Sequence, residues 1–212
     1  MNPSYTPPVS QKTSTASGGA GRPGAAQAGA KPARWCRLAR GLERTLALIG
    51  LALLLYLPFF ETSTIVSNSM TPTLTGNGGP GSDWVLTEKL SYFFRNPRRW
   101  EVLAFQNHEG VRIMKRVVGL PGETVALHQD GTFLINNTPI ERPAVLRENK
   151  YYAVGRLLEK TGAVSDGGYF VLGDDSRDSD DSRYNPGVKP DALRGRPWLI
   201  LWPPQHMGFV NP

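Results

Sequence analysis

The feature that most constrains this chain is a run of 16 uncharged, mostly apolar residues, Thr45 to Phe60, bounded by Arg44 and Glu61. A core helix keeps a polar face at 3.6-residue spacing, and this run has none. A spanning helix needs about 20 apolar residues, and extension back to Leu38 supplies the missing turn. We therefore predict a membrane anchor over residues 38–60. The alternative that this run is a cleaved signal peptide is disfavoured, because the apolar part of a signal peptide rarely follows so long a charged region.

The positive charge of the chain lies ahead of this run. Residues 1–44 contain seven Lys or Arg against one acid, a net of +6, while residues 61–212 contain 17 of each sign. This asymmetry predicts that the N-terminus is cytoplasmic and that residues 61–212 lie outside the membrane. Because the charge of residues 61–212 is balanced, we expect no nucleic-acid binding. Residues 1–37, rich in Gly, Ala, Pro and Ser, are expected to form a disordered basic tail.

Residues 61–212 have the pattern of β structure. Short apolar runs alternate with Gly, Pro and Asn turn signals, and the expected strands are 83–87, 101–105, 111–118, 124–127, 132–135, 169–172 and 198–202. This pattern predicts a mostly β fold with an antiparallel sandwich or barrel-like core. The single cysteine, Cys36, lies ahead of the anchor and excludes both an internal disulfide and a cysteine-based zinc site.

The remaining metal-binding residue types give no convincing metal pattern. The three histidines, at positions 108, 128 and 206, lack the short spacing of metal pairs, and we read them as surface residues. Residues 174–181 hold five carboxylates but lack the order of an EF-hand, and an arginine lies among them. They fit a loop braced by its own ion pairs, or a solvated polar loop. We expect no metal and no cofactor.

Two segments carry residues suited to nucleophilic chemistry. In the first, residues 67–74, Pro72 holds the chain extended or turning so that small hydroxyls stand exposed. In the second, strand alternation gives Lys115 the same facing as Ile113 and Val117, and an apolar face lowers the pKa of a lysine and makes its amine a possible base. The alternatives are an ordinary Ser/Thr-Pro loop and a lysine whose head group extends back to water.

Taken in order, these segments resemble the type I signal peptidases, which are membrane-anchored serine–lysine proteases. The resemblance covers residues 45 to about 202 and rests on Ser69-Met70-Thr71-Pro72-Thr73, Lys115 to Gly122 with Glu123 after it, Gly173-Asp174, and Ser179 to Arg183, with a looser match at Ser82 to Val85. The chain departs from the family pattern in reading Gly-Asp-Asp-Ser-Arg where Gly-Asp-Asn-Arg is common. The glycine-rich loop 75–82 is also longer.

The resemblance implies specific roles for the site residues. Ser69 would be the nucleophile and Lys115 the neutral general base. The backbone N–H of Ser69 and the hydroxyl of Ser67 would bind the oxyanion. Ser179 would orient the lysine amine.

The resemblance also implies a structural frame and a substrate pocket. Asp181 and Arg183 would form a structural salt bridge, and residues 123–168 would be the variable second lobe, a compact β-ribbon. Shallow pockets for small residues at positions −1 and −3 of the substrate would be lined by Ile65, Val66, Met70, Leu74, Ile113 and Met114. Walls of this kind accept alanine and exclude larger side chains, so Ala-x-Ala cleavage sites follow.

The implied function is removal of signal peptides from secretory pre-proteins by Ser/Lys acyl-enzyme chemistry. The enzyme would be a single-pass protein of a bacterial-type cytoplasmic membrane, in contact with lipid, with its catalytic domain outside and its oligomeric state open. Residues 92–94 would either dip into the membrane interface or end a packed strand. Two alternatives remain: a specialised peptidase of the same chemistry, as in conjugation-pilus maturation, and a non-catalytic membrane-tethered β module.

Overall fold

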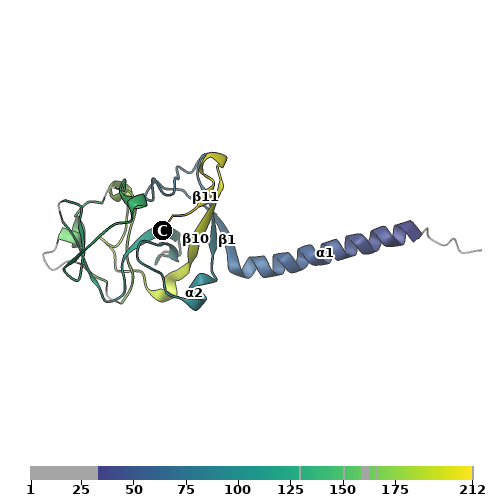
Figure 1. Cartoon of the computed structure of the whole chain (residues 1–212), viewed down its shortest axis with the longest axis horizontal. Coiled ribbons are helices and arrows are strands. Elements are labelled where there is room, and N and C mark those ends of the chain that lie inside the picture. Colours follow the sequence, from purple (N-terminus) through teal and green to yellow (C-terminus); the bar gives the residue numbers. More distant parts are fainter. Residues whose placement is uncertain (1–32, 129, 150, 159–162, 166, 212) are drawn as a thin grey trace, which may run out of the picture. The chain divides into compact units, whose positions relative to one another are not determined.

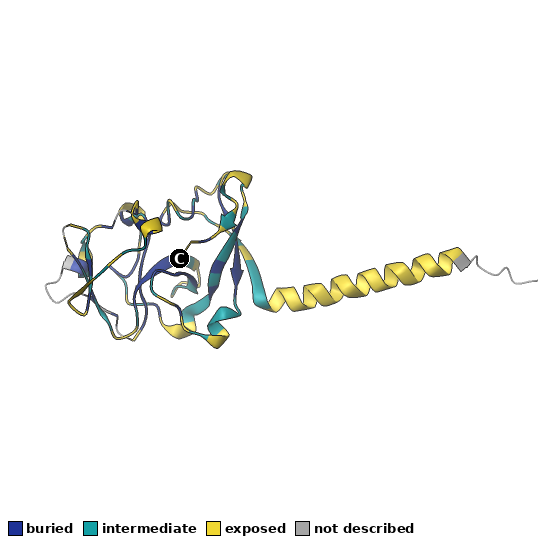
Figure 2. Ribbon diagram, in the orientation of Figure 1, coloured by how far each residue is buried: buried dark blue, intermediate teal, exposed yellow. Residues whose placement is uncertain are grey.

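A single long helix precedes the β structure. The computed structural model describes residues 33–128, 130–149, 151–158, 163–165 and 167–211. The chain divides into two units, residues 1–47 and 48–212, and helix α1 (Ala33–Phe59) crosses the division. Residues Arg34–Phe59 are long and apolar enough to span a membrane, and the most apolar part of this helix is exposed throughout (Figure 2). The tail expected at residues 1–37 lies outside the described residues up to position 32, and residues 33–37 belong to α1.

The described residues of the second unit form two antiparallel sheets (Figure 1). The strands are β1 (Phe60–Thr64), β2 (Trp84–Glu88), β3 (Val102–Gln106), β4 (Arg112–Gly119), β5 (Thr124–Leu127), β6 (Phe133–Ile135), β7 (Thr138–Ile140), β8 (Ala163–Val164), β9 (Phe170–Leu172), β10 (Leu193–Trp202) and β11 (Gly208–Phe209). The short helices are α2 (Ser91–Phe94), η1 (Ala144–Leu146), η2 (Gly155–Leu158), η3 (Ser176–Asp178), η4 (Pro190–Ala192) and η5 (Pro204–His206).

The larger sheet has the order β1-β2-β10-β3-β4-β9, with β11 on β10, and the smaller has the order β7-β6-β5-β8. The expectation of a mostly β, antiparallel fold is confirmed. The expected strands correspond to β2 to β6, β9 and β10, within a residue at each end except that β10 begins five residues early. The smaller sheet falls inside residues 123–168, where we expected the second lobe.

Strand β10 holds the larger sheet together because it pairs with three strands. Its beginning pairs with β3, and its remainder pairs with β2 and β11. The change of partner occurs around Gly195, whose φ of 152° lies in a region that favours glycine. A Cβ at this position would lie 2.5 Å from the carbonyl oxygen of Glu88. Glycine is therefore required where β10 passes from one neighbour to the next.

The two sheets share a hydrophobic core. Buried side chains of the smaller sheet, Val125 and Phe133 among them, pack in one cluster with Trp100 and Phe170 of the larger sheet's side. The Phe133 ring meets the rings of Trp100 and Tyr151 edge-on, at centroid distances of 5.6 and 5.3 Å. The smaller sheet therefore depends on the larger one for burial of its apolar face.

Residues 92–94 lie in helix α2, and their side chains differ in burial. Tyr92 packs partly buried against the cluster that contains Leu103 and Val117. Phe93 and Phe94 are 73% and 86% exposed. One aromatic side chain therefore belongs to the core, and the next two face away from it.

We predict that Phe133→Ala lowers the free energy of unfolding by about 3–5 kcal/mol, because it leaves a cavity between the rings of Trp100 and Tyr151. Val145→Ala, at a position that is 51% exposed, is the control and should change stability by no more than about 0.5 kcal/mol. Denaturant unfolding of the full chain in detergent measures both values. A loss below about 1 kcal/mol for Phe133→Ala would show that the lobes do not share a tightly packed core.

Candidate active site

Ser69 lies in a tight turn a few residues after β1. The backbone N–H of Thr71 donates to the carbonyl of Asn68 at 3.0 Å, and that of Leu74 donates to the carbonyl of Met70 at 2.8 Å. These bonds fix the segment and leave Ser69 only 7% exposed. A buried serine in a hydrogen-bonded turn has a defined position, which a reactive hydroxyl needs.

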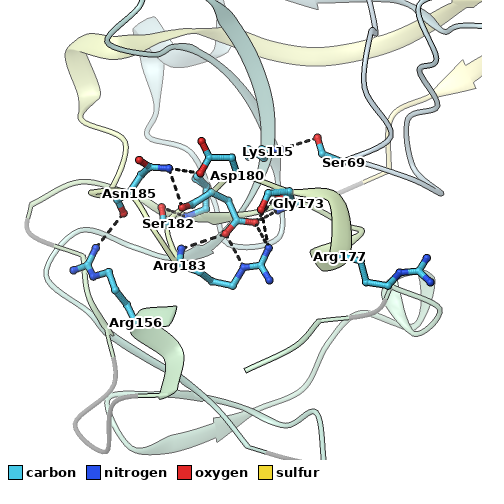
Figure 3. A network of polar contacts seen from close by, with 12 residues as sticks. Ser69, Lys115, Arg156, Gly173, Arg177, Asp180, Ser182, Arg183 and Asn185 are labelled. Carbon is cyan, nitrogen blue, oxygen red and sulfur yellow. Dashed lines mark hydrogen bonds and ion pairs between the residues drawn. The ribbon is translucent and has the colours of Figure 1, made fainter. Parts of the chain in front are cut away.

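Lys115 approaches Ser69 from the middle of β4. Its residue is 3% exposed, and its Nζ atom lies 2.6 Å from the Oγ atom of Ser69 (Figure 3). The Oγ atom of Ser67 lies 3.2 Å from the same Oγ, and Ser67 is exposed. The structure thus brings together three predicted site residues from segments 46 positions apart in the sequence.

The surroundings of Lys115 favour its neutral amine. Burial lowers the pKa of Lys115, and this effect exceeds the opposing attraction of the Asp181 and Asp180 carboxylates. Desolvation acts in this direction because an ammonium group loses its hydration in an apolar site. A larger fraction of Lys115 is therefore unprotonated near neutral pH than for a lysine in water.

Residues 179–183 form a buried ionic bracket beside the lysine. The carboxylate of Asp181 accepts bonds from the Nε and one Nη atom of Arg183 at 2.8 and 2.9 Å, and both side chains are fully buried. The backbone N–H of Gly173 and the hydroxyl of Ser179 donate to the same carboxylate at 3.0 and 2.6 Å. Because the Ser179 hydroxyl is bound to Asp181 here, the lysine-orienting role expected of Ser179 stays a prediction.

A second buried ion pair supports the nucleophile turn, and its full set of partners has no clear signal in the sequence. Arg116, the neighbour of Lys115, binds both carboxylate oxygens of Asp174 at 2.7 Å. Thr73, at the end of the nucleophile turn, donates to Asp174 at 2.5 Å, and Tyr151 of the second lobe donates to it at 2.9 Å. One carboxylate therefore joins the turn, β4 and the second lobe.

A hollow of about 340 Å³ opens beside Ser69 and Lys115. Its wall includes Ile65, Val66, Met70, Ile113 and Met114, which are five of the six expected pocket residues. The sixth, Leu74, is fully buried in the hydrophobic cluster that also contains Met70. Five of the expected pocket residues therefore gather at one place, and Leu74 does not line it.

The glycine-rich loop 75–82 does not line this hollow but packs behind it. Gly76 lies so close to Ile65 that a Cβ would be 2.5 Å from the Ile65 side chain. Asp83 closes the loop by accepting from the Thr75 N–H at 2.7 Å, and it also lies 2.9 Å from Nδ1 of His206. This His206 partner, 123 positions away, was not visible in the sequence.

The other two histidines, at positions 108 and 128, are exposed. Within the part of the chain that the structure describes, no group of three His, Cys, Asp or Glu side chains is placed to hold a metal ion. The site is instead a serine and a desolvated lysine at the edge of an apolar hollow.

Comparisons with known proteins agree on one family. The family model for signal peptidase, peptidase S26, matches residues 38–202. A signal peptidase I from Leptolyngbya laminosa is 35% identical over 161 residues, covering 72% of this chain and 73% of the relative. One from Bacillus caldolyticus is 31% identical over 159 residues, covering 71% and 84%. A crystal structure of a signal peptidase I from Enterococcus faecalis is 32% identical and covers 48% of this chain and 97% of that chain, with a TM-score of 0.39.

These matches place the protein among the serine endopeptidases. The chain belongs to the signal peptidase family, peptidase S26. Its apolar N-terminal helix fits a membrane-anchored member of that family. The resemblance found in the sequence motifs is thereby confirmed.

We predict that Gly173→Ala lowers kcat/KM about a hundredfold without unfolding the protein, because misplacement of a reacting group by about 1 Å has an effect of this size. A Cβ at position 173 would lie 2.3 Å from the Ser179 hydroxyl and 2.4 Å from the Ser69 carbonyl oxygen, so the nucleophile must move. Gly81→Ala is the matched control, since its Cβ would meet no atom within 4 Å. Peptidase assays and circular dichroism compare the two; equal activity would disprove the positioning role of Gly173.

Proposed function

We propose that this protein removes signal peptides from exported pre-proteins, with Ser69 as nucleophile and Lys115 as general base. The observation that carries the proposal is the 2.6 Å contact between Nζ of a buried lysine and Oγ of a buried serine. A serine hydroxyl is unreactive until a base takes its proton, and a lysine serves as that base only when it is neutral. The low exposure and lowered pKa of Lys115 support this role.

The reaction follows from that contact. The Ser69 hydroxyl donates its proton to the Lys115 amine as Oγ attacks the carbonyl carbon of substrate residue −1. The resulting Lys115 ammonium then protonates the leaving nitrogen, the C–N bond breaks, and residue −1 remains as an ester on Ser69. In the second half, the neutral Lys115 takes a proton from water as the water oxygen attacks the ester carbon. The Lys115 ammonium then returns a proton to Oγ of Ser69 as the ester C–O bond breaks, which releases the signal peptide with a new carboxyl end.

The tetrahedral oxyanion needs donors that are already in place. The Ser67 hydroxyl, 3.2 Å from the Ser69 hydroxyl, and the Ser69 backbone N–H are the groups we assign to it. Loss of one such donor in other hydrolases lowers kcat about 10²–10³-fold. The ionic bracket of Asp181 and Arg183 has a structural role, because it holds residues 173 and 179 against the nucleophile turn.

The apolar hollow supports a preference for small residues before the cleaved bond. Its walls are side chains such as Ile65, Met70 and Ile113, which accept a methyl group and exclude bulk. Ala-x-Ala is the sequence that such a hollow fits, with residues −1 and −3 directed into it. The same walls exclude water from Lys115, so substrate selection and activation of the base have one physical cause.

The location of the site suits a substrate held in the membrane. Helix α1 ends at Phe59, and Ser69 follows ten residues later. A signal peptide presents its cleavage site just beyond its own apolar segment, on the outer side. We assign residues 1–37 to the cytoplasm, 38–60 to the anchor and 61–212 to an extracytoplasmic domain, with 123–168 as its second lobe, because the basic cluster precedes the helix.

We predict that Ser69→Ala and Lys115→Ala each abolish cleavage of a pre-protein with an Ala-x-Ala site, because one removes the nucleophile and the other its base. Both variants should keep the wild-type circular dichroism spectrum. Gel assays of purified protein in detergent measure cleavage, with Ser91→Ala, in α2, as the serine control. Full activity in Lys115→Ala would eliminate the assigned base, and cleavage by both variants would reveal a contaminating protease.

We also predict that kcat/KM rises with pH and then levels at an apparent pKa below the ordinary lysine value of 10.5. The value of kcat/KM rises with pH because protonated Lys115 cannot accept a proton, so activity is lost as pH falls below the pKa of Lys115. Initial rates between pH 5 and about 10 measure the profile, and the reference is the ordinary pKa of lysine. A rate that still rises tenfold per unit at about pH 10 would argue against a desolvated amine.

A further inference from the structure

A second hollow adjoins the one described above. It has a volume of about 490 Å³ and lies between the turn that joins β3 to β4 and residues 180–192. The two hollows share Ile113 and Asp180 in their walls. A peptide that extends from the first hollow into the second would therefore pass Asp180.

The Asp180 carboxylate is held at this boundary although its residue is exposed. The Nδ2 atom of Asn185 donates to its Oδ1 atom at 2.6 Å, and the carbonyl of Asn185 accepts from Arg156 at 3.1 Å (Figure 3). The backbone N–H of Asn185 donates to the carbonyl of Asp181 at 3.0 Å. Several hydrogen bonds thus hold Asn185 in place, and Asn185 in turn holds the Asp180 carboxylate.

The charge of Asp180 is not compensated by an ion pair among the residues that the structure describes, in contrast to that of Asp181. Asp181, next to it, is paired with Arg183, and Asp191 and Lys189 on the far wall have opposite signs. Asp180 has no ion pair with any other residue that the structure describes, and its hydrogen-bond partner, Asn185, is neutral. A negative potential therefore remains at the boundary of the two hollows.

We propose that the second hollow receives the substrate segment after the cleaved bond, and that Asp180 selects against acidic residues there in favour of basic ones. The inference rests on the proposed function, which directs residues −1 and −3 into the first hollow. The inference adds a charge preference for the substrate residues after the cleaved bond, which the apolar first hollow does not contact. Asp180 is a specificity residue in this scheme and takes no part in bond making.

The expected size of the preference is modest, because the carboxylate is exposed to solvent. Opposite charges a few ångströms apart near a surface change kcat/KM by about three- to tenfold between a basic and an acidic residue. Salt weakens interactions between exposed charges, with a screening length of about 10 Å at 0.1 M and 3 Å at 1 M. The preference should therefore fade in 1 M salt, which a purely structural role of Asp180 would not produce.

The test uses matched pre-proteins that differ by Lys or Glu at position +1, +2 or +3. The full-length wild-type protein in detergent should cleave the Lys form about three- to tenfold better than the Glu form at one or more of these positions. Asp180→Asn should bring that ratio close to one, because asparagine still accepts the Asn185 hydrogen bond while the charge is gone. Asp180→Lys should invert the ratio.

Two variants make the matched controls. Asp178→Asn removes an exposed carboxylate that lines the first hollow alone, and Asp130→Asn makes the same change of net charge on the turn between β5 and β6. Both should keep the wild-type Lys/Glu ratio. An unchanged ratio in Asp180→Asn, or an equal change in either control, would overturn the inference. Failure of the wild type to cleave any of these pre-proteins would instead refute the proposed function.

Discussion

The site depends on the removal of water from one amine. Lys115 lies in the middle of a strand, with β3 on one side and β9 on the other, so its side chain reaches Ser69 without passing through solvent. A buried ammonium is unfavourable, so burial lowers the pKa of Lys115 and favours its neutral form. Asp181, the nearest candidate partner, is occupied by Arg183. Because Asp181 is paired with Arg183, it stabilises the ammonium form of Lys115 less than an unpaired carboxylate would.

Two buried ion pairs surround this amine, and each is fully hydrogen-bonded on its carboxylate side. Isolated buried pairs add little stability, because desolvation offsets their attraction. Their value here is geometric: Asp174 and Asp181 each collect donors from several segments that must converge on Ser69. Removal of either carboxylate would leave a buried arginine without its partner, a change that is strongly destabilising. Position and stability are therefore coupled in residues 173–183.

The sequence predicted the class of fold well, because strand alternation and turn residues are local signals. It missed β1, since Phe60 continues the apolar run and residues 61–64 are polar, and it missed β7, β8 and β11, which are two or three residues long. The pairing of Ser69 with Lys115 came from motif resemblance, because no local rule joins residues so far apart. The partners of Asp174 and the His206–Asp83 contact depend on tertiary packing and carry no sequence pattern. The position of Asp180 at the boundary of two hollows also depends on tertiary packing and has no sequence pattern.

The junction of α1 and β1 has a mechanical consequence. The helix ends at Phe59 and the strand begins at Phe60, so no flexible linker intervenes. Strand β1 pairs along its whole length with β2 and leads directly to Ile65 and Val66 in the wall of the first hollow. A displacement of the helix end would therefore move the wall of the first hollow, because no linker is present to absorb it.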